Sequence, residues 1–294
     1  MAADGNGDRA GTASAVRRYY EGNTRLFLAL GIGGKALAMR RAVWADGVTD
    51  LPEAVNHVNT RIAEEVLACQ AAPGQTAPLR VLDIGCGVGG SLFYLRGAVG
   101  PALEGVGVTI SPRQVEMARR QARFRGVDGV SFLAADFSTL SVLPPFLCAF
   151  AIESFVHFGS PGSFFSAAAR ALEPAGRLVV VDDFLARERL AAREEKLVRA
   201  FRRGWVLSSL CTAGRAAHAA AESGLRLVED RDLSPFLSSL PLGAPLTAFL
   251  SLVVGALPVP WSYWRSTAGS LALAACQKAG LVQYHYLVFE KASR

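Results

Sequence analysis

The sequence predicts an α/β protein in which a parallel sheet has helices on both faces. Between residues 79 and 184, short apolar segments typical of strands alternate with segments of helical spacing. A glycine-rich stretch leads from the first of these strands into a helix, which is typical of the ligand-binding edge of open α/β sheets. Helical spacing prevails before residue 79 and again from about residue 187. We therefore expect a helical cap and a helical lid around the sheet.

The chain divides into three parts. Residues 1–15 are small, polar and mixed in charge, without a signal-peptide pattern, so we expect a disordered leader. Residues 16–78 form the helical cap. Residues 79–294 form the core, with the lid at about 187–278.

Seven strands are expected within the core. They cover residues 79–85, 104–110, 130–136, 147–154, 176–184, 225–233 and 283–292. After the glycine turn, further helices are expected at residues 111–126, 161–172, 188–205 and 213–224. The helix over 111–126 is well delimited. Ser111 is its N-cap, Pro112 occupies its first position and Gly126 ends it.

Composition narrows the class of protein. The net charge of +6 and the pI near 9.3 suit an anionic substrate or a lipid surface. Nucleic acid is not an expected partner, because no run of Lys and Arg is interleaved with aromatic residues. The five cysteines are scattered without a CxxC pair, which favours reduced thiols in the cytoplasm and argues against zinc. No metal ligands are predicted.

One apolar segment stands apart in the second half of the chain. Residues 244–260 carry no charge, but prolines interrupt both ends and the segment is too short for a membrane span. A buried or lid helix is the favoured interpretation, and attachment to a membrane surface is the alternative.

The glycine-rich stretch "VLDIGCGVGG" identifies a candidate ligand site. Asp83 comes at the carboxyl end of the first strand, and Gly85, Gly87 and Gly90 fit the spacing of a dinucleotide-binding turn. Glycine lets the backbone approach a ligand closely. A carboxylate at Asp83 would repel a pyrophosphate but suits a ligand that carries an ammonium group, such as S-adenosylmethionine.

The D-x-G-C-G-x-G-G pattern resembles motif I of the class I S-adenosylmethionine-dependent methyltransferases, and the resemblance runs from about Leu79 to Phe184. It implies a Rossmann-like, seven-stranded, mostly parallel sheet with the helical N-terminal segment and lid described above. It also implies S-adenosylmethionine as cofactor and S-adenosylhomocysteine as product. By this resemblance the backbone at Gly85 and Gly87 contacts the methionine portion of the cofactor, with Asp83 close by.

The next motif, "GVTISPRQ", has no acidic residue at the end of the second strand. It resembles the branch that contains tocopherol methyltransferases and cyclopropane fatty-acid synthases, which implies that Thr109, Ile110 and Gln114 hold the ribose part of the cofactor. In the same way Asp136 is expected to pair with the adenine amino group. Phe137 is expected to pack on the adenine ring, although a phenylalanine there also fits the core.

The stretch "FAIESFVHFG" places Glu153 at the end of an apolar strand, where a carboxylate is solvated, paired or used. Its Glu-Ser pair resembles that of tocopherol, sterol and prenyl-diphosphate C-methyltransferases, which implies that Glu153 faces the methyl-accepting centre. Carbon methylation of an alkene leaves a carbocation, which a carboxylate stabilises before taking a proton. His157 either assists, bonds to Glu153 or has a structural role.

The cap contributes candidate acceptor-binding residues. The segment "RRYYEGNTRLF" resembles the part of this branch that closes over the cofactor, so Tyr19 and Tyr20 are candidates, with a core aromatic stripe as the alternative. Arg40 and Arg41 are candidates for an anionic headgroup or a diphosphate, and a solvated basic face is the alternative. The apolar, aromatic and proline-rich residues 235–264 indicate an apolar acceptor pocket.

Together these features favour methyl transfer from S-adenosylmethionine to a small apolar acceptor, by carbon methylation of an isoprenoid or terpenoid in secondary metabolism. Mg²⁺ is expected only if that acceptor is a diphosphate. The alternatives are O- or N-methylation of an aromatic natural product, and a non-catalytic protein that binds a cofactor or lipid. Peripheral membrane contact and oligomerisation stay open.

Overall fold

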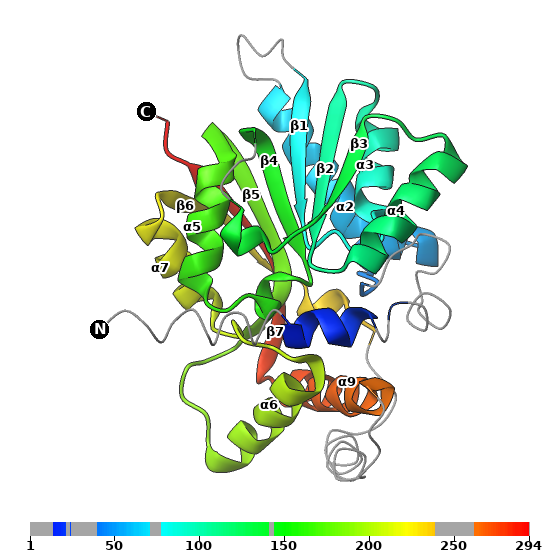
Figure 1. Ribbon diagram of the computed structural model, residues 1–294. Coiled ribbons are helices and arrows are strands. Elements are labelled where there is room, and N and C mark those ends of the chain that lie inside the picture. The colour runs from blue at the N-terminus through cyan, green and yellow to red at the C-terminus, as the bar shows by residue number, and fades with distance from the viewer. Residues whose placement is uncertain are drawn as a thin grey trace.

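A seven-stranded sheet with helices on both faces forms the centre of the computed structural model (Figure 1). The structure describes residues 14–21, 24, 40–70, 78–140, 144–238 and 262–293. The strands are β1 (Leu79–Ile84), β2 (Leu103–Thr109), β3 (Val130–Ala134), β4 (Phe146–Ile152), β5 (Leu172–Leu185), β6 (Leu225–Asp232) and β7 (Val282–Lys291). Their order is β3-β2-β1-β4-β5-β7-β6. Strand β7 runs antiparallel to both β5 and β6, and the other neighbouring strands are parallel, so the expected fold class is confirmed.

The helices form two layers. They are α2 (Leu51–Gln70), α3 (Gly90–Val99), α4 (Pro112–Arg125), α5 (Pro161–Ala171), α6 (Ala192–Trp205), α7 (Ala213–Glu222) and α9 (Ser262–Lys278), with short 3₁₀ turns η1 (Phe137–Thr139), η2 (Phe155–His157) and η3 (Ser234–Phe236). Side chains of α2, α3 and α4 pack on one face of the sheet, and those of α5 and α7 pack on the other. Residues 14–21 form a further helix near the N-terminus.

The expected ends of α4 are confirmed. The Ser111 hydroxyl accepts a hydrogen bond from the backbone N–H of Gln114, and Pro112 begins the helix. Gly126 ends it at φ 62°, a left-handed conformation that glycine adopts at little cost. Strand β5 begins at Leu172, four residues before the expected start at Gly176, because Leu172 already pairs with Phe146 of β4, ahead of a register shift between Phe146 and Cys148.

The region expected as a lid has two different parts. Strand β6 pairs with β7 at the edge of the sheet, and α7 packs beside α5, so both belong to the sheet layers. Helices α6 and α9 pack against each other beyond the carboxyl ends of the parallel strands (Figure 1). The indole N–H of Trp205 donates to the carbonyl oxygen of Ser266, which joins these two helices.

The expected leader lies almost wholly outside the described residues, and the apolar segment 244–260 lies outside them entirely. None of the described helices is both long enough and apolar enough to cross a membrane.

Candidate active site

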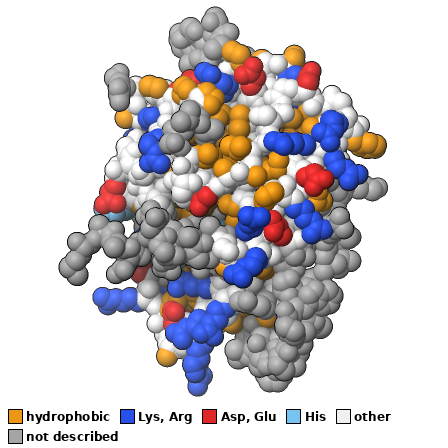
Figure 2. Space-filling view, in the orientation of Figure 1, with side chains coloured by type: hydrophobic (Ala, Val, Ile, Leu, Met, Phe, Trp, Pro, Cys, Tyr) orange, Lys and Arg blue, Asp and Glu red, His pale blue; other side chains and the backbone are white. Residues whose placement is uncertain are grey.

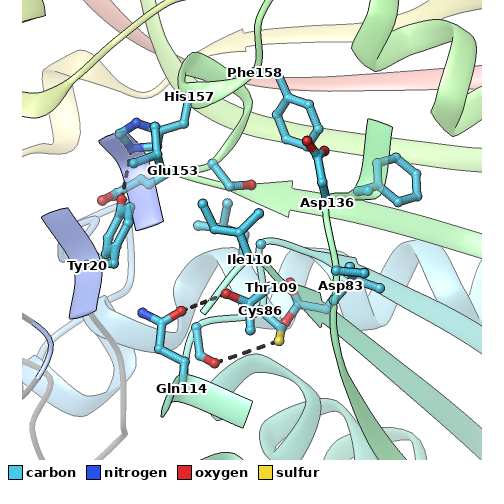
Figure 3. Close-up of a pocket in the computed structure, with 18 of the residues that line it drawn as sticks. Tyr20, Asp83, Cys86, Thr109, Ile110, Gln114, Asp136, Glu153, His157 and Phe158 are labelled. Carbon is cyan, nitrogen blue, oxygen red and sulfur yellow. Dashed lines mark hydrogen bonds between the residues drawn. The ribbon is translucent and has the colours of Figure 1, made fainter. Parts of the chain in front are cut away.

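A pocket lies at the carboxyl ends of β1, β2 and β4, where loops follow the parallel strands (Figure 3). The N-terminal helix covers it from the side of α6 and α9 (Figure 1). The predicted site residues that line the pocket are Asp83, Gly85, Gly87, Thr109, Ile110, Gln114, Asp136, Phe137, Glu153, His157, Tyr20 and Arg40. Tyr19 and Arg41 are outside this lining.

The glycine turn after β1 is held in a conformation that a side chain would obstruct. Gly85 has φ 88°, and a Cβ atom there would come within 2.4 Å of the Ser154 Cβ atom. The Ser154 hydroxyl donates to the carbonyl oxygen of Ile84 at 2.5 Å, and the Gly85 N–H donates to the carbonyl oxygen of Val108 at 2.8 Å. The turn therefore brings bare backbone to the floor of the pocket.

Asp83 is a buried carboxyl group to which the described residues supply no hydrogen-bond donor. Its exposed fraction is 3%, and no described residue donates to it. Burial raises the pKa of Asp83 to about 8, although the positive charge of Arg40 acts to lower it. A ligand with an ammonium group would supply the missing donor and charge, so this residue fits the amino group of S-adenosylmethionine.

The Arg40 side chain is held by protein groups. Its guanidinium donates to the carbonyl oxygen of Val55 at 2.9 Å and to the hydroxyl of Ser91 at 2.8 Å. A third bond, at 3.2 Å, goes to the side-chain oxygen of Asn56. Burial lowers the pKa of Arg40. These contacts fix the guanidinium at the Asp83 end of the pocket.

Thr109 and Gln114 join the second strand to the N-terminal helix. The Thr109 hydroxyl donates to the Gln114 side-chain oxygen at 2.7 Å (Figure 3). The Gln114 amide donates to the hydroxyl of Thr24 at 3.1 Å, and Thr24 donates to the carbonyl oxygen of Tyr20 at 2.6 Å. Gln114 is thus buried and bonded internally, and its expected contact with ribose stays a prediction.

Asp136 caps the 3₁₀ turn that follows β3. Its Oδ1 atom accepts hydrogen bonds from the backbone N–H of Ser138 at 2.9 Å and from the Ser138 hydroxyl at 2.7 Å. No described residue donates to Oδ2, which leaves that oxygen for a ligand donor. Phe137 is buried beside Phe158 with 6.2 Å between ring centroids. Its expected contact with adenine stays a prediction.

The described residues hold one carboxylate oxygen of Glu153 firmly and supply no partner for the other. Its backbone adopts φ 49°, an unusual conformation for a residue with a side chain. The Oε1 atom accepts from the Arg41 backbone N–H at 3.0 Å, from Arg41 Nε at 3.3 Å and from the Tyr284 hydroxyl at 3.0 Å. No described donor reaches Oε2. This arrangement suits a carboxylate that acts on a ligand.

Arg41 is the counterion of this carboxylate. Its Nη1 atom bonds to Asp183 at 2.8 Å, and its guanidinium lies 3.8 Å from the ring centroid of Tyr284. Burial acts to lower the pKa of Arg41, but Asp183 and Glu153 raise it overall. These partners engage Nε and Nη1, whereas the buried Nη2 atom has no partner among the described residues, and the expected contact of Arg41 with an anionic ligand stays a prediction.

Two neighbouring aspartates lie behind this group. Burial raises the pKa of Asp183 even though Arg41 acts to lower it. Burial raises the pKa of Asp182 as well, and the adjacent Asp183 adds to the shift. The Asp182 carboxylate accepts from the backbone N–H groups of Asp183 at 2.8 Å and Val156 at 3.1 Å.

His157 is neutral and bonded on both sides. Burial lowers the pKa of His157 to about 4. The Nδ1 atom lies 3.3 Å from the carbonyl oxygen of Val206, which can only accept, so Nδ1 carries the hydrogen. The Nε2 atom therefore accepts from the Tyr20 hydroxyl at 2.8 Å (Figure 3). The other tyrosine of the pair, Tyr19, donates instead to the hydroxyl of Ser266 on α9 at 3.0 Å.

Three residues that shape the site were not predicted. Tyr284 contacts Glu153 from the last strand, and nothing in its local sequence marks it. Asp183 comes near the end of β5, after the apolar residues 178–181. A carboxylate after an apolar run is the signal that identified Glu153, and it could have identified Asp183 as well. Ser154 stood in the motif but had no assigned role. Within the described residues, no group of three or more His, Cys, Asp or Glu side chains is placed to hold a metal ion.

The strand order and the glycine turn at Asp83 define a class I methyltransferase fold. Residues 81–176 match the model of the family described as a methyltransferase domain. The chain therefore contains a methyltransferase domain, as its motifs predicted.

Among relatives, the 24-methylenesterol C-methyltransferase 2 of Oryza sativa subsp. japonica is 29% identical over 255 residues. The match covers 82% of this chain and 64% of that protein. The chain thus spans less than two thirds of the length of the curated plant sterol methyltransferases that it matches.

Two solved structures share the fold. The [4+2]-cyclase SpnF aligns with a TM-score of 0.69 at 21% identity, covering 95% of this chain and 96% of that chain. The geranyl diphosphate C-methyltransferase of Streptomyces coelicolor A3(2) aligns with a TM-score of 0.65 at 17% identity, covering 96% and 98%. That enzyme was solved with Mg²⁺, geranyl diphosphate and S-adenosyl-L-homocysteine.

Proposed function

We propose that this protein transfers a methyl group from S-adenosylmethionine to a carbon atom of a small isoprenoid or terpenoid. The observation that carries the proposal is a pair of carboxylates in one pocket. Asp83 has no donor from the described residues, and Glu153 has an oxygen free of them. The first suits the amino group of the cofactor, and the second suits positive charge that develops on the acceptor.

The cofactor would be held at the Asp83 end of the pocket. Asp83 would bind its amino group, and the bare backbone at Gly85 and Gly87 would pass beside its methionine portion. The free oxygen of Asp136 would accept from the adenine amino group. When bound, the cofactor supplies a methyl group activated by a sulfonium, so the protein mainly has to position and desolvate the acceptor.

Glu153 would act on the acceptor. An alkene that takes up a methyl group becomes a carbocation, which a nearby carboxylate stabilises and then deprotonates. The three donors on Oε1 fix the carboxylate while Oε2 is free of described donors. Fixed charge of this kind needs little rearrangement during the reaction, which is why it is effective.

The contacts of the two arginines favour an acceptor without a diphosphate. Arg40 is bonded to three protein groups, and two carboxylates, Glu153 and Asp183, balance the charge of Arg41 although its Nη2 atom has no described partner. A diphosphate near Glu153 would meet like charge. A neutral isoprenoid suits the described part of the pocket better, and Mg²⁺ would then have no role.

O-methylation of a phenolic natural product is the second candidate, and His157 is the observation that favours it. A neutral imidazole whose Nε2 already accepts a hydrogen bond from a phenol, Tyr20, has the properties of a general base. In that reaction Glu153 would orient the nucleophile and would not stabilise a carbocation.

Purified protein should be incubated with S-adenosylmethionine labelled in its methyl group and with neutral terpenoids, prenyl diphosphates, phenols or amines. The wild type is compared with Glu153→Gln and His157→Gln. Label in a hydrocarbon product that Glu153→Gln abolishes supports the proposal. Label on oxygen that only His157→Gln abolishes supports the second candidate. Cofactor binding without any methyl transfer would favour a non-catalytic protein.

A further inference from the structure

Helix α6 has a row of basic side chains on its outer face, at the end of the molecule where Lys and Arg gather below the sheet (Figure 2). Its inner face is buried, with Val198 and Phe201 in the core, and the helix packs along α9. The basic row consists of exposed side chains three or four residues apart on α6: Arg193, Lys196, Arg199 and Arg203. This spacing places them on one side of the helix.

Carboxylates do not neutralise the centre of the basic row. The ion pair on this helix joins Glu194 to Arg187, which is outside the row. No described carboxylate forms an ion pair with Arg193, Lys196 or Arg199. Glu195 lies on the same helix but forms no described ion pair, so the centre of the row has no ion-pair partner among the described residues.

Helix α4 is also rich in arginine, but protein groups engage three of its five arginine side chains, and only Arg120 and Arg123 are exposed without such a described contact. Arg113 donates to the carbonyl oxygen of Glu21, and Arg119 donates to that of Phe132. Arg125 lies over the ring of Phe93. A basic composition alone therefore does not distinguish α6, whereas an exposed row without carboxylate partners at its centre does.

The position of the basic row adds a second argument. Helices α6 and α9 lie on the side of the pocket that the N-terminal helix covers, and Val16 and Tyr20 of that helix line the pocket (Figure 1). The chain that enters α9 has no charged residue between Asp232 and Arg265. In sequence, this uncharged and largely apolar stretch leads directly into α9, which packs along the basic helix α6. An anionic bilayer can interact with both the positive charge and the apolar sequence, whereas nucleic acid or an acidic protein would interact mainly with the charge.

We propose that the basic row of α6 docks this protein on an anionic lipid bilayer, with the covered side of the pocket toward the membrane. The inference does not depend on the proposed reaction, although a bilayer is where an apolar acceptor dissolves. Each basic side chain near an anionic surface strengthens binding roughly five-fold. Removing three of them should weaken binding about 100-fold.

Binding to vesicles of phosphatidylglycerol and phosphatidylcholine in equal parts tests the proposal by co-sedimentation. The variant Arg193→Gln/Lys196→Gln/Arg199→Gln is compared with the wild type. The matched control, Arg120→Gln/Arg123→Gln/Arg215→Gln, removes the same charge from exposed positions on α4 and α7. Unfolding by urea confirms that each variant is folded.

We expect the wild type and the control to sediment with the anionic vesicles and the α6 variant to stay in the supernatant. High salt should release the wild type, because it screens exposed charges. Equal binding of the α6 variant and the control would overturn the proposal. The proposal would also be overturned if the wild type did not bind anionic vesicles, even if its basic row bound a soluble acidic protein.

Discussion

The substitution Asp83→Asn should stabilise the protein in the absence of ligand, and the gain should grow with pH. The pKa of Asp83 is about 8 in the folded protein and has its ordinary value of 3.8 in the unfolded chain. Below about pH 4 both states are protonated, so the substitution changes little. Between about pH 4 and pH 8 the folded state binds more protons than the unfolded state. The contribution of Asp83 to the stability of the wild type therefore falls as pH rises through this window and is constant above it.

The size of the effect follows from the same two values. Each pH unit within the window costs the wild type about 1.4 kcal/mol. The free energy of unfolding of Asp83→Asn should exceed that of the wild type by about 1.5 kcal/mol at pH 5 and about 4 kcal/mol at pH 7. Asp83 is almost wholly buried, so solvent should screen little of this difference.

Urea unfolding of both proteins without ligand, from pH 4 to pH 9, measures the difference directly. A second series with S-adenosylhomocysteine, which keeps the amino group, should stabilise the wild type more than the variant. A difference that does not change with pH would refute the reasoning. So would a wild type that is the more stable protein at pH 9, since Asp83 would then have a partner that stabilises its charge without the ligand.

Three further changes test other parts of the site. Gly85→Ala should lower the free energy of unfolding by at least about 2 kcal/mol, because Gly85 has a positive φ and the new Cβ atom would lie 2.4 Å from the Ser154 Cβ atom. Gly97→Ala in α3 is the control and should be tolerated, because a Cβ atom there meets open space. Arg41→Met should lower the free energy of unfolding by about 3–5 kcal/mol, because it leaves buried carboxylates unpaired. Adding Asp183→Asn should restore part of this loss in a double-mutant cycle measured by urea unfolding, and a fully additive cycle would contradict the pairing. The pKa of His157 is lowered to about 4, so the folded state favours the neutral imidazole. This contribution to stability, up to about 3 kcal/mol, is fully present above about pH 6.5 and is lost as pH falls toward 4. His157→Gln should flatten the acid side of the stability profile, and an unchanged profile would exclude this role.

The parts of the fold that the sequence predicted are those with strong local signals. Alternating strands and helices identified the sheet, and the caps of α4 followed from Ser111, Pro112 and Gly126. The glycine turn located the pocket because parallel strands end at the same edge of a sheet. The motif residues Asp83 and Glu153 do meet in that pocket.

The partners of those motif residues were out of reach, because their contacts join distant parts of the chain. Arg41 and Tyr284 meet at Glu153 although 243 residues separate them. Neighbours on a helix point in different directions, so the sequence could not tell which of Tyr19 and Tyr20 faces the pocket. The tertiary contacts distinguish them: Tyr19 bonds to Ser266 on α9, and Tyr20 bonds to His157 in the pocket.

The place of β7 in the sheet has a consequence for synthesis of the protein. Strand β7, residues 282–291, lies between β5 and β6, and it carries the tyrosine that holds Glu153. In a nascent chain that has left the ribosome only as far as β6, one edge of β5 is unpaired. Glu153 also lacks the hydrogen bond from the Tyr284 hydroxyl. Open edges of this kind favour pairing with other chains. The growing chain therefore passes through an aggregation-prone stage until residue 291 emerges, and premature termination before β7 would leave it there.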